Sequence, residues 1–147
     1  MVLNQDFKEF LYALHVNQVR YLVVGDYAVA LHGHPRYTKD MDIWIERTPD
    51  NTQRMVAAMN DFGFSSLALA ESDFLEEDQI IQLGYAPTRI DIITELPGVT
   101  FSESYKMRVV VQIDDLPVSF IDLANLRRNK RASGRYQDLA DLENLQG

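Results

Sequence analysis

Two aspartates in a hydrophobic segment are the first residues of this chain that could do chemistry. Asp40 and Asp42 lie two positions apart in residues 40–46 (DMDIWIE), a segment whose alternation predicts a β-strand. Side chains two positions apart in a strand point to the same face, so both carboxylates would share one small space. Such a pair indicates a bound cation, nearby basic residues or simple exposure to water. The apolar neighbours in this strand weigh against simple exposure.

Asp91 is a third acidic residue with surroundings of the same kind. It lies in residues 89–94 (RIDIIT), another predicted strand, where an unpaired charge would be costly and needs a compensating group. Arg89 is expected to point to the opposite face and to be a poor partner for Asp91. If this strand neighbours the strand of Asp40 and Asp42, the three carboxylates converge. Such a set suits one or two octahedral Mg²⁺ ions bound through acids, waters and substrate phosphates.

A glycine turn precedes these acids in the chain. Residues 20–24 (RYLVV) predict a strand that stops at Gly25, and Asp26 could cap the helix that follows. The backbone N–H groups and the helix dipole at such a turn can receive an anion. Taken alone, this turn is a weak indication of an anion site.

The composition fits one globular domain. The chain has 147 residues, a formal net charge of −8 and no Cys, which excludes a disulfide framework, a thiolate nucleophile and an iron–sulfur cluster. The excess of acidic residues opposes unassisted binding to a nucleic-acid backbone, apart from a local basic cluster within residues 127–135. No apolar run could span a bilayer and the first residues lack a secretion leader. We therefore expect a cytoplasmic protein without a membrane segment.

The spacing of apolar residues predicts helices packed on a mixed β-sheet, which is fold class α/β or α+β. Strands are expected at residues 20–24, 40–46, 79–83, 89–94, 107–113 and 118–121. Helices are expected after Asn4, after Asp26, over residues 48–63 with Asp50 as the cap, and in two pieces from about residue 122 that hinge near Gly134. No linker separates two domains, so we expect a single domain over residues 1–147.

Joined in order, these elements resemble the nucleotidyltransferase superfamily of polymerase-β type. The resemblance covers nearly the whole chain and extends to VGDYAVALHGHPRYTKDMDIWI, RIDIIT and NKRASGRYQDLADLENL. These segments look like the small bacterial nucleotidyltransferases grouped with AbiEii-type toxins. The resemblance implies a nucleotidyltransferase fold, with a mixed sheet flanked by helices and a C-terminal helical segment.

The resemblance also implies roles for individual residues. Gly25 would hold the phosphates of a nucleotide, and Asp40, Asp42 and Asp91 would bind Mg²⁺ or Mn²⁺ as the catalytic acids. Lys130, in the Asn-Lys-Arg motif of the C-terminal segment, would lie near the triphosphate.

Asp26 belongs to the nucleotide-binding turn but departs from the pattern of the family, which prefers Ser or Gly at this position. A carboxylate repels phosphate. Asp26 could cap the helix while turned away from the nucleotide, or it could weaken the binding of a triphosphate. The residues alone leave both alternatives open.

The function implied by the resemblance is a metal-dependent transfer of a nucleoside monophosphate from an NTP to an acceptor hydroxyl. The acceptor would be RNA, such as a tRNA 3′ end, or a protein, and a cognate antitoxin or toxin would be the partner. The alternative is a catalytically weakened relative that binds a nucleotide or a partner protein. A purely structural domain would need a basic partner for each of the three acids.

Overall fold

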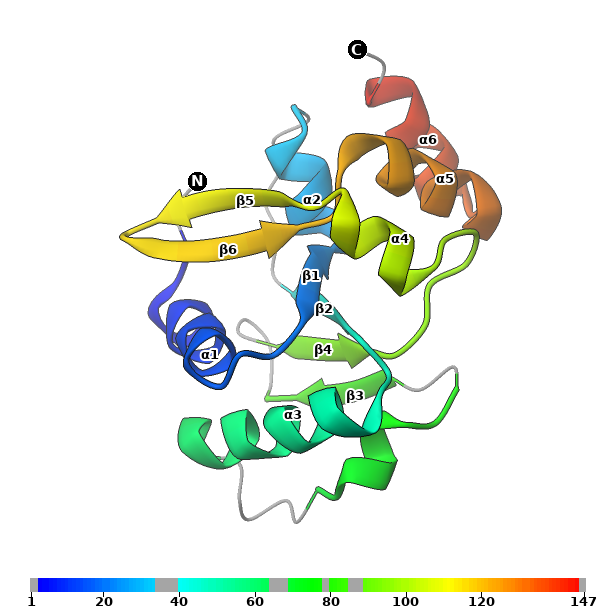
Figure 1. Ribbon diagram of the computed structural model, residues 1–147. Coiled ribbons are helices and arrows are strands. Elements are labelled where there is room, and N and C mark those ends of the chain that lie inside the picture. Colours follow the sequence, from blue (N-terminus) through cyan, green and yellow to red (C-terminus); the bar gives the residue numbers. More distant parts are fainter. Residues whose placement is uncertain (1–2, 34–39, 64–68, 78–79, 85–88, 146–147) are drawn as a thin grey trace.

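The computed structural model describes residues 3–33, 40–63, 69–77, 80–84 and 89–145 (Figure 1). Its helices are α1 (Gln5–Val16), α2 (Gly25–Leu31), α3 (Pro49–Phe62), α4 (Phe101–Lys106), α5 (Leu123–Ser133) and α6 (Tyr136–Asn144), with a 3₁₀ turn η2 (Glu71–Phe74). Its strands are β1 (Tyr21–Val24), β2 (Met41–Ile45), β3 (Ile80–Leu83), β4 (Ile90–Ile93), β5 (Val109–Ile113) and β6 (Leu116–Phe120). Apart from α4 and η2, these helices and strands lie along the chain where the spacing of apolar residues predicts them.

The six described strands form one mixed sheet in the order β3-β4-β2-β1-β6-β5. The two central strands, β1 and β2, are antiparallel, whereas β1 runs parallel to β6 and β2 runs parallel to β4. Antiparallel hairpin-type pairs, β3 with β4 and β5 with β6, complete the two edges. The end of β1 therefore lies beside the beginning of β2, which in turn lies beside the beginning of β4.

Helices cover both faces of this sheet, because alternate residues of each strand enter different cores. Figure 1 shows α1 and α3 together on one side and α2, α5 and α6 grouped on the other. The first face supplies Tyr21, Val23, Met41, Ile43 and Ile92 to the larger core, with Phe7 and Phe10 of α1 and Met55 of α3. The second face supplies Leu22, Val24 and Trp44 to a smaller core, with Val29 of α2 and Leu126 of α5. Since Asp42 alternates with Met41 and Ile43, it belongs to the second face.

Helix ends are set by local chemistry. Asn4 caps α1 as expected, and its side-chain oxygen accepts a hydrogen bond of 2.9 Å from the Phe7 N–H. The expectation that Asp50 caps α3 was wrong, because the side chain of Thr48 accepts the N–H of Asn51 and the helix begins at Pro49. Proline at the first helical position has no N–H that needs a partner, so the cap lies before it.

One helix was not expected from the sequence. The segment that forms α4 has six residues, too few for a helical repeat of apolar side chains to show. Its Phe101 nevertheless packs edge-on against Trp44, with ring centroids 5.1 Å apart, and stacks on Tyr105.

Within the described residues, no helix has both the length and the apolar surface needed to cross a bilayer.

Candidate active site

Three carboxylates lie together where the end of β1 meets the beginnings of β2 and β4. Asp42 and Asp91 are direct register partners on the two parallel strands, whose backbones lie about 4.8 Å apart in any sheet. Asp40 precedes β2 by one residue. All three line a pocket of about 640 Å³, together with residues of α2, α5 and α6. The structure thus brings together the three acids singled out by their spacing.

Gly25 places the turn after β1 directly against Asp42. Val24 pairs with Asp42 across the antiparallel β1–β2 ladder, and Gly25 follows with φ +64°. A Cβ atom at this position would lie 2.1 Å from Asp42 Oδ2, far inside van der Waals contact. Glycine is therefore required twice, for its left-handed backbone and for the space that the carboxylate occupies.

Asp26 lies in the first turn of α2 and is exposed at the pocket. The expectation that it caps this helix was wrong: α2 begins at Gly25, and the cap position is Val24, whose side chain cannot accept a hydrogen bond. The strand passes into the helix without an intervening residue, because Gly25 makes the turn itself. A carboxylate in the first turn is still favourable to the helix dipole.

The side chain of Arg89 does not lie where the sequence predicted. Its guanidinium lies between two of the acids, with Nη2 2.9 Å from Asp40 Oδ2 and Nε 3.2 Å from Asp91 Oδ1. Nη2 also donates a hydrogen bond of 3.3 Å to Asp91 Oδ2. Arg89 was expected on the face opposite Asp91, but residues two positions apart in extended chain share a face. The compensating cation that Asp91 needs is thus its near neighbour in the sequence.

The charges around Asp42 change its ionisation. Burial is the main cause that raises the pKa of Asp42 to about 7, and the negative charges of Asp91, Asp26 and Asp40 raise it further. Arg89 acts in the opposite direction but does not cancel these effects. A carboxyl group with such a pKa is only partly ionised at neutral pH, as is typical of a buried acid that lacks a sufficient counter-charge.

The donor chemistry of the site fits Mg²⁺ or Mn²⁺, since both prefer carboxylate oxygens. Within the described part of the chain, Asp91 Oδ1 and Arg89 Nε are buried without a hydrogen-bond partner, because their 3.2 Å contact is not aligned as one. However, no group of three acidic or histidine side chains among the described residues is arranged to hold a metal ion. In this arrangement the guanidinium of Arg89 contacts both Asp40 and Asp91.

Lys130 lines the same pocket from α5 but is bound to the protein itself. Its Nζ lies 3.0 Å from Asp138 Oδ1 and 3.1 Å from Asp141 Oδ2, and all three side chains are buried. Burial alone would raise the pKa of Asp138, but hydrogen bonds from Arg135, Ser133 and Lys130 hold it well below its usual range. Lys130 therefore joins α5 to α6 through a buried ion pair at the wall of the pocket.

Arg135 is a pocket residue that the sequence did not single out for a role. It begins the turn into α6, with 77% of its side chain exposed, and its Nε lies 2.8 Å from Asp138 Oδ2. Asp138 raises the pKa of Arg135, and the more distant Asp42 and Asp26 act in the same direction. An exposed guanidinium thus faces the acids across the pocket. Its membership of the basic cluster at residues 127–135 was the one available signal.

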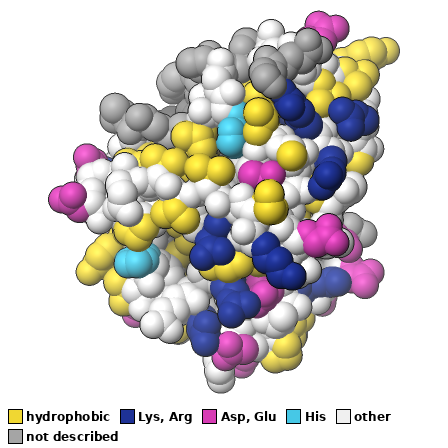
Figure 2. All heavy atoms as spheres, turned by 45° about the horizontal axis from the view of Figure 1, so that its top comes forward, with side chains coloured by type: hydrophobic (Ala, Val, Ile, Leu, Met, Phe, Trp, Pro, Cys, Tyr) yellow, Lys and Arg dark blue, Asp and Glu magenta, His cyan; other side chains and the backbone are white. Residues whose placement is uncertain are grey.

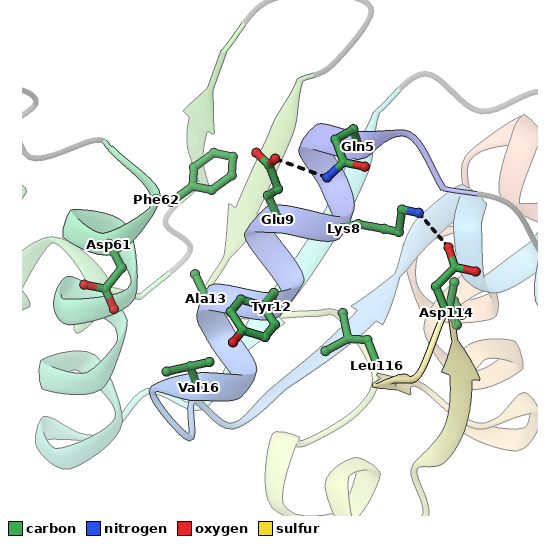
Figure 3. A pocket seen from close by; sticks show the side chains of 11 residues that line it. Gln5, Lys8, Glu9, Tyr12, Ala13, Val16, Asp61, Phe62, Asp114 and Leu116 are labelled. Carbon is green, nitrogen blue, oxygen red and sulfur yellow. Dashed lines mark hydrogen bonds and ion pairs between the residues drawn. The ribbon is translucent and has the colours of Figure 1, made fainter.

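A second pocket, of about 520 Å³, lies between α1, the end of α3 and the turn that joins β5 to β6 (Figure 3). Lys8 in this pocket forms an ion pair of 2.6 Å with Asp114, and Gln5 donates a hydrogen bond to Glu9. Two pairs of its polar side chains are therefore engaged with one another. The pocket lies on the α1–α3 side of the sheet, whereas Asp42 lies on the other side.

No family model and no curated protein matches the sequence closely enough to assign a family. Solved structures match its fold. A candidate nucleotidyltransferase from Thermotoga maritima superposes with a TM-score of 0.64 at 13% identity, over 93% of this chain and 88% of that one. The chain has the nucleotidyltransferase fold.

Two further solved structures share the nucleotidyltransferase fold. A lincosamide antibiotic adenylyltransferase, in its lincomycin-bound form, gives a TM-score of 0.55 at 15% identity, over 98% of this chain and 96% of that one. An antigenic nucleotidyltransferase-like protein from Paracoccidioides brasiliensis gives 0.54 at 14% identity, over 95% and 72%. The predicted fold is confirmed, whereas membership of the AbiEii-like group stays a prediction.

Proposed function

We propose that this chain is a metal-dependent nucleotidyltransferase, which moves a nucleoside monophosphate from an NTP to an acceptor hydroxyl and releases pyrophosphate. One observation carries the proposal: Asp40, Asp42 and Asp91 gather beside the Gly25 turn, in a pocket of a chain with the nucleotidyltransferase fold. Arg89 compensates Asp40 and Asp91 only in part, because the pKa of Asp42 is still raised to about 7, and a divalent cation would supply the missing positive charge. In this proposal residues 1–147 act as one domain.

In this proposal the three aspartates of the pocket hold the metal and accept a proton. Mg²⁺ or Mn²⁺, held by Asp40, Asp42 and Asp91, would supply Lewis-acid stabilisation of the negative charge on the phosphates. The acceptor oxygen attacks the α-phosphorus, the bond from this phosphorus to the α–β bridging oxygen breaks, and pyrophosphate leaves with that electron pair. Asp91 accepts the proton of the attacking hydroxyl. In this proposal the Asp91 carboxylate thus activates the acceptor hydroxyl.

The opposite wall and the turn would hold the triphosphate. Gly25 has no Cβ, so a phosphate can approach the backbone N–H groups at this turn. Arg135 offers an exposed guanidinium, which can bind phosphate oxygens in pairs. Lys130 adds its charge from within the wall and keeps α5 and α6 together through Asp138. In this proposal Lys130 acts on the triphosphate at longer range than Arg135.

The proposed acceptor is RNA, such as a tRNA 3′ end, or a protein hydroxyl, and the proposed partner is a cognate antitoxin or toxin. The support is the resemblance to AbiEii-type enzymes and the basic cluster of α5 at residues 127–135. Figure 2 shows basic and acidic side chains interspersed on the face that it presents. With a net charge of −8, RNA would be guided by the local basic cluster rather than by the field of the whole protein. Cytoplasmic location stays a prediction from the sequence.

A label-transfer assay tests the proposal. The protein is incubated with each α-labelled NTP, Mg²⁺ or Mn²⁺, and total cellular RNA and protein, and the destination of the label is followed. Replacing Asp40, Asp42 or Asp91 by Asn should lower transfer by at least about a hundredfold, because each change removes one charge from the site. Asp50→Asn is the matched control, since this exposed acid on α3 pairs only locally with Arg54. Full transfer in the three site variants would overturn the assignment.

A second candidate function is a catalytically weakened module that binds a nucleotide or a partner protein. The observation in its favour is Asp26, an exposed carboxylate at the pocket where a triphosphate would lie. If Asp26 opposes the phosphates, Asp26→Ser should tighten NTP binding by roughly 1–4 kcal/mol in calorimetry with Mg²⁺ present. Binding by Asp26→Ser but not by the natural chain would favour the weakened module over the enzyme.

A further inference from the structure

The guanidinium of Arg89 is a cation that already forms ion pairs with two carboxylates of the site. It makes contacts of 2.9 Å to Asp40, which directly precedes β2, and of 3.2 Å to Asp91 in β4. An arginine side chain is planar and always charged, so it can bridge two carboxylates in a fixed geometry. The same carboxylates are those from which the proposed function needs metal ligands.

A divalent ion competes with Arg89 for these carboxylates. A metal ligand oxygen lies about 2.0–2.2 Å from Mg²⁺ or Mn²⁺, well inside the distance at which a guanidinium nitrogen contacts it. Two cations at such a distance also repel each other strongly. Binding of a metal to both Asp40 and Asp91 therefore favours withdrawal of the guanidinium from at least one of them.

The position of Arg89 in the chain allows such a withdrawal. Its backbone is held at the beginning of β4, where the Met41 N–H donates a hydrogen bond of 3.1 Å to the Arg89 carbonyl. Its side chain is 37% exposed and lines the open pocket of about 640 Å³, so it can rotate without unfolding the strand. Arg135, the other arginine of this pocket, is paired with Asp138 instead.

We propose that Arg89 is a resident counter-cation of the carboxylate site, which divalent metal displaces from Asp40 and Asp91. The inference rests on the proposed function, because it states how the metal site of that function is controlled. Arg89 compensates part of the negative charge of Asp40 and Asp91 while the metal is absent. In this state it is a positioning residue for the two carboxylates.

Binding of Mn²⁺ alone to metal-free protein tests this proposal without any need for transfer activity. The affinity is measured by electron paramagnetic resonance of free Mn²⁺ in the natural chain and in Arg89→Gln, which removes the competitor. Arg135→Gln is the matched control, because it removes the same charge from the same pocket but leaves Asp40 and Asp91 untouched. A double variant, Asp40→Asn with Asp42→Asn, reports any Mn²⁺ bound elsewhere.

The expected result is at least about tenfold tighter Mn²⁺ binding in Arg89→Gln and a change of less than about threefold in Arg135→Gln. Arg89→Lys keeps the charge without the planar fork and should lie between Arg89→Gln and the natural chain, which also covers a failure of Arg89→Gln to fold. Equal gains in the two Gln variants would mean that the field of the pocket, not displacement, governs affinity, and would overturn the proposal. Unchanged or weaker binding in Arg89→Gln would overturn it as well.

The same titration separates this inference from the proposed function. Mn²⁺ binding that is lost in the double aspartate variant but insensitive to Arg89 contradicts only the inference. Absence of specific Mn²⁺ binding in every variant contradicts both, since the carboxylates would then not be a metal site.

Discussion

Replacing Asp42 by Asn in the metal-free protein tests the electrostatics of the site through stability. Burial, with the charges of Asp91, Asp26 and Asp40, raises the pKa of Asp42 from its ordinary value of 3.8 to about 7. The folded chain then holds this proton more tightly than the unfolded chain, so stability is full below pH 3.8 and falls as the pH rises through about 7. At about 1.4 kcal/mol per pKa unit, ionisation costs the folded state on the order of 4 kcal/mol, an upper bound because water reaches the pocket.

Asparagine has the shape of the aspartate but never ionises, so the variant should avoid this cost. In urea unfolding with a chelator present, the gain in unfolding free energy should be near zero at about pH 4 and reach on the order of 4 kcal/mol at about pH 8. Asp50→Asn, at an exposed acid on α3, should show no such growth with pH. A gain that is the same at all pH values, or larger at low pH, would refute the reasoning.

Two further substitutions probe the walls of the pocket. Lys130→Met should lower the unfolding free energy by about 3–5 kcal/mol in urea, because its two carboxylate partners stay buried without their lysine; a loss below about 1 kcal/mol would show that the pair is not needed. Gly25→Ala should abolish detectable NTP binding in calorimetry and lower the melting temperature, because its Cβ would displace Asp42. Gly63→Ala, at a positive φ where a Cβ meets nothing within 4 Å, should lower only the melting temperature, and equal loss of binding in both would contradict this explanation.

The fold was predictable where the sequence carries a clear period. The alternation in residues 40–46 and 89–94 and the long apolar stripe before Gly63 found β2, β4 and α3 to within two residues at each end. The helix α4 was missed because six residues hold less than two helical turns. Short elements of this kind are decided by packing, here of Phe101 on Trp44, rather than by their own pattern.

The acids and Lys130 of the candidate site were predictable from the sequence, whereas the ion pairs of its basic residues were not. Asp91 stands out because a charge inside an apolar strand needs an explanation. Asp138 and Asp141, the partners of Lys130, lie in the following helix α6. The turn at Gly134 between α5 and α6 brings them to Lys130. The exposure of Arg135 depends on the same turn. Long side chains that cross between elements leave no periodic signal.

The carboxylate site depends on the parallel pairing of β2 with β4. Asp42 and Asp91 are far apart in the sequence, and parallel strands need a long crossover between them, so their meeting carries a large loop-closure cost. A one-residue slip of either strand would turn its acid toward the α1–α3 core. A chain in which β2 and β4 are not paired cannot offer a metal both ligands, so an ion bound here should protect the central sheet from hydrogen exchange rather than one loop.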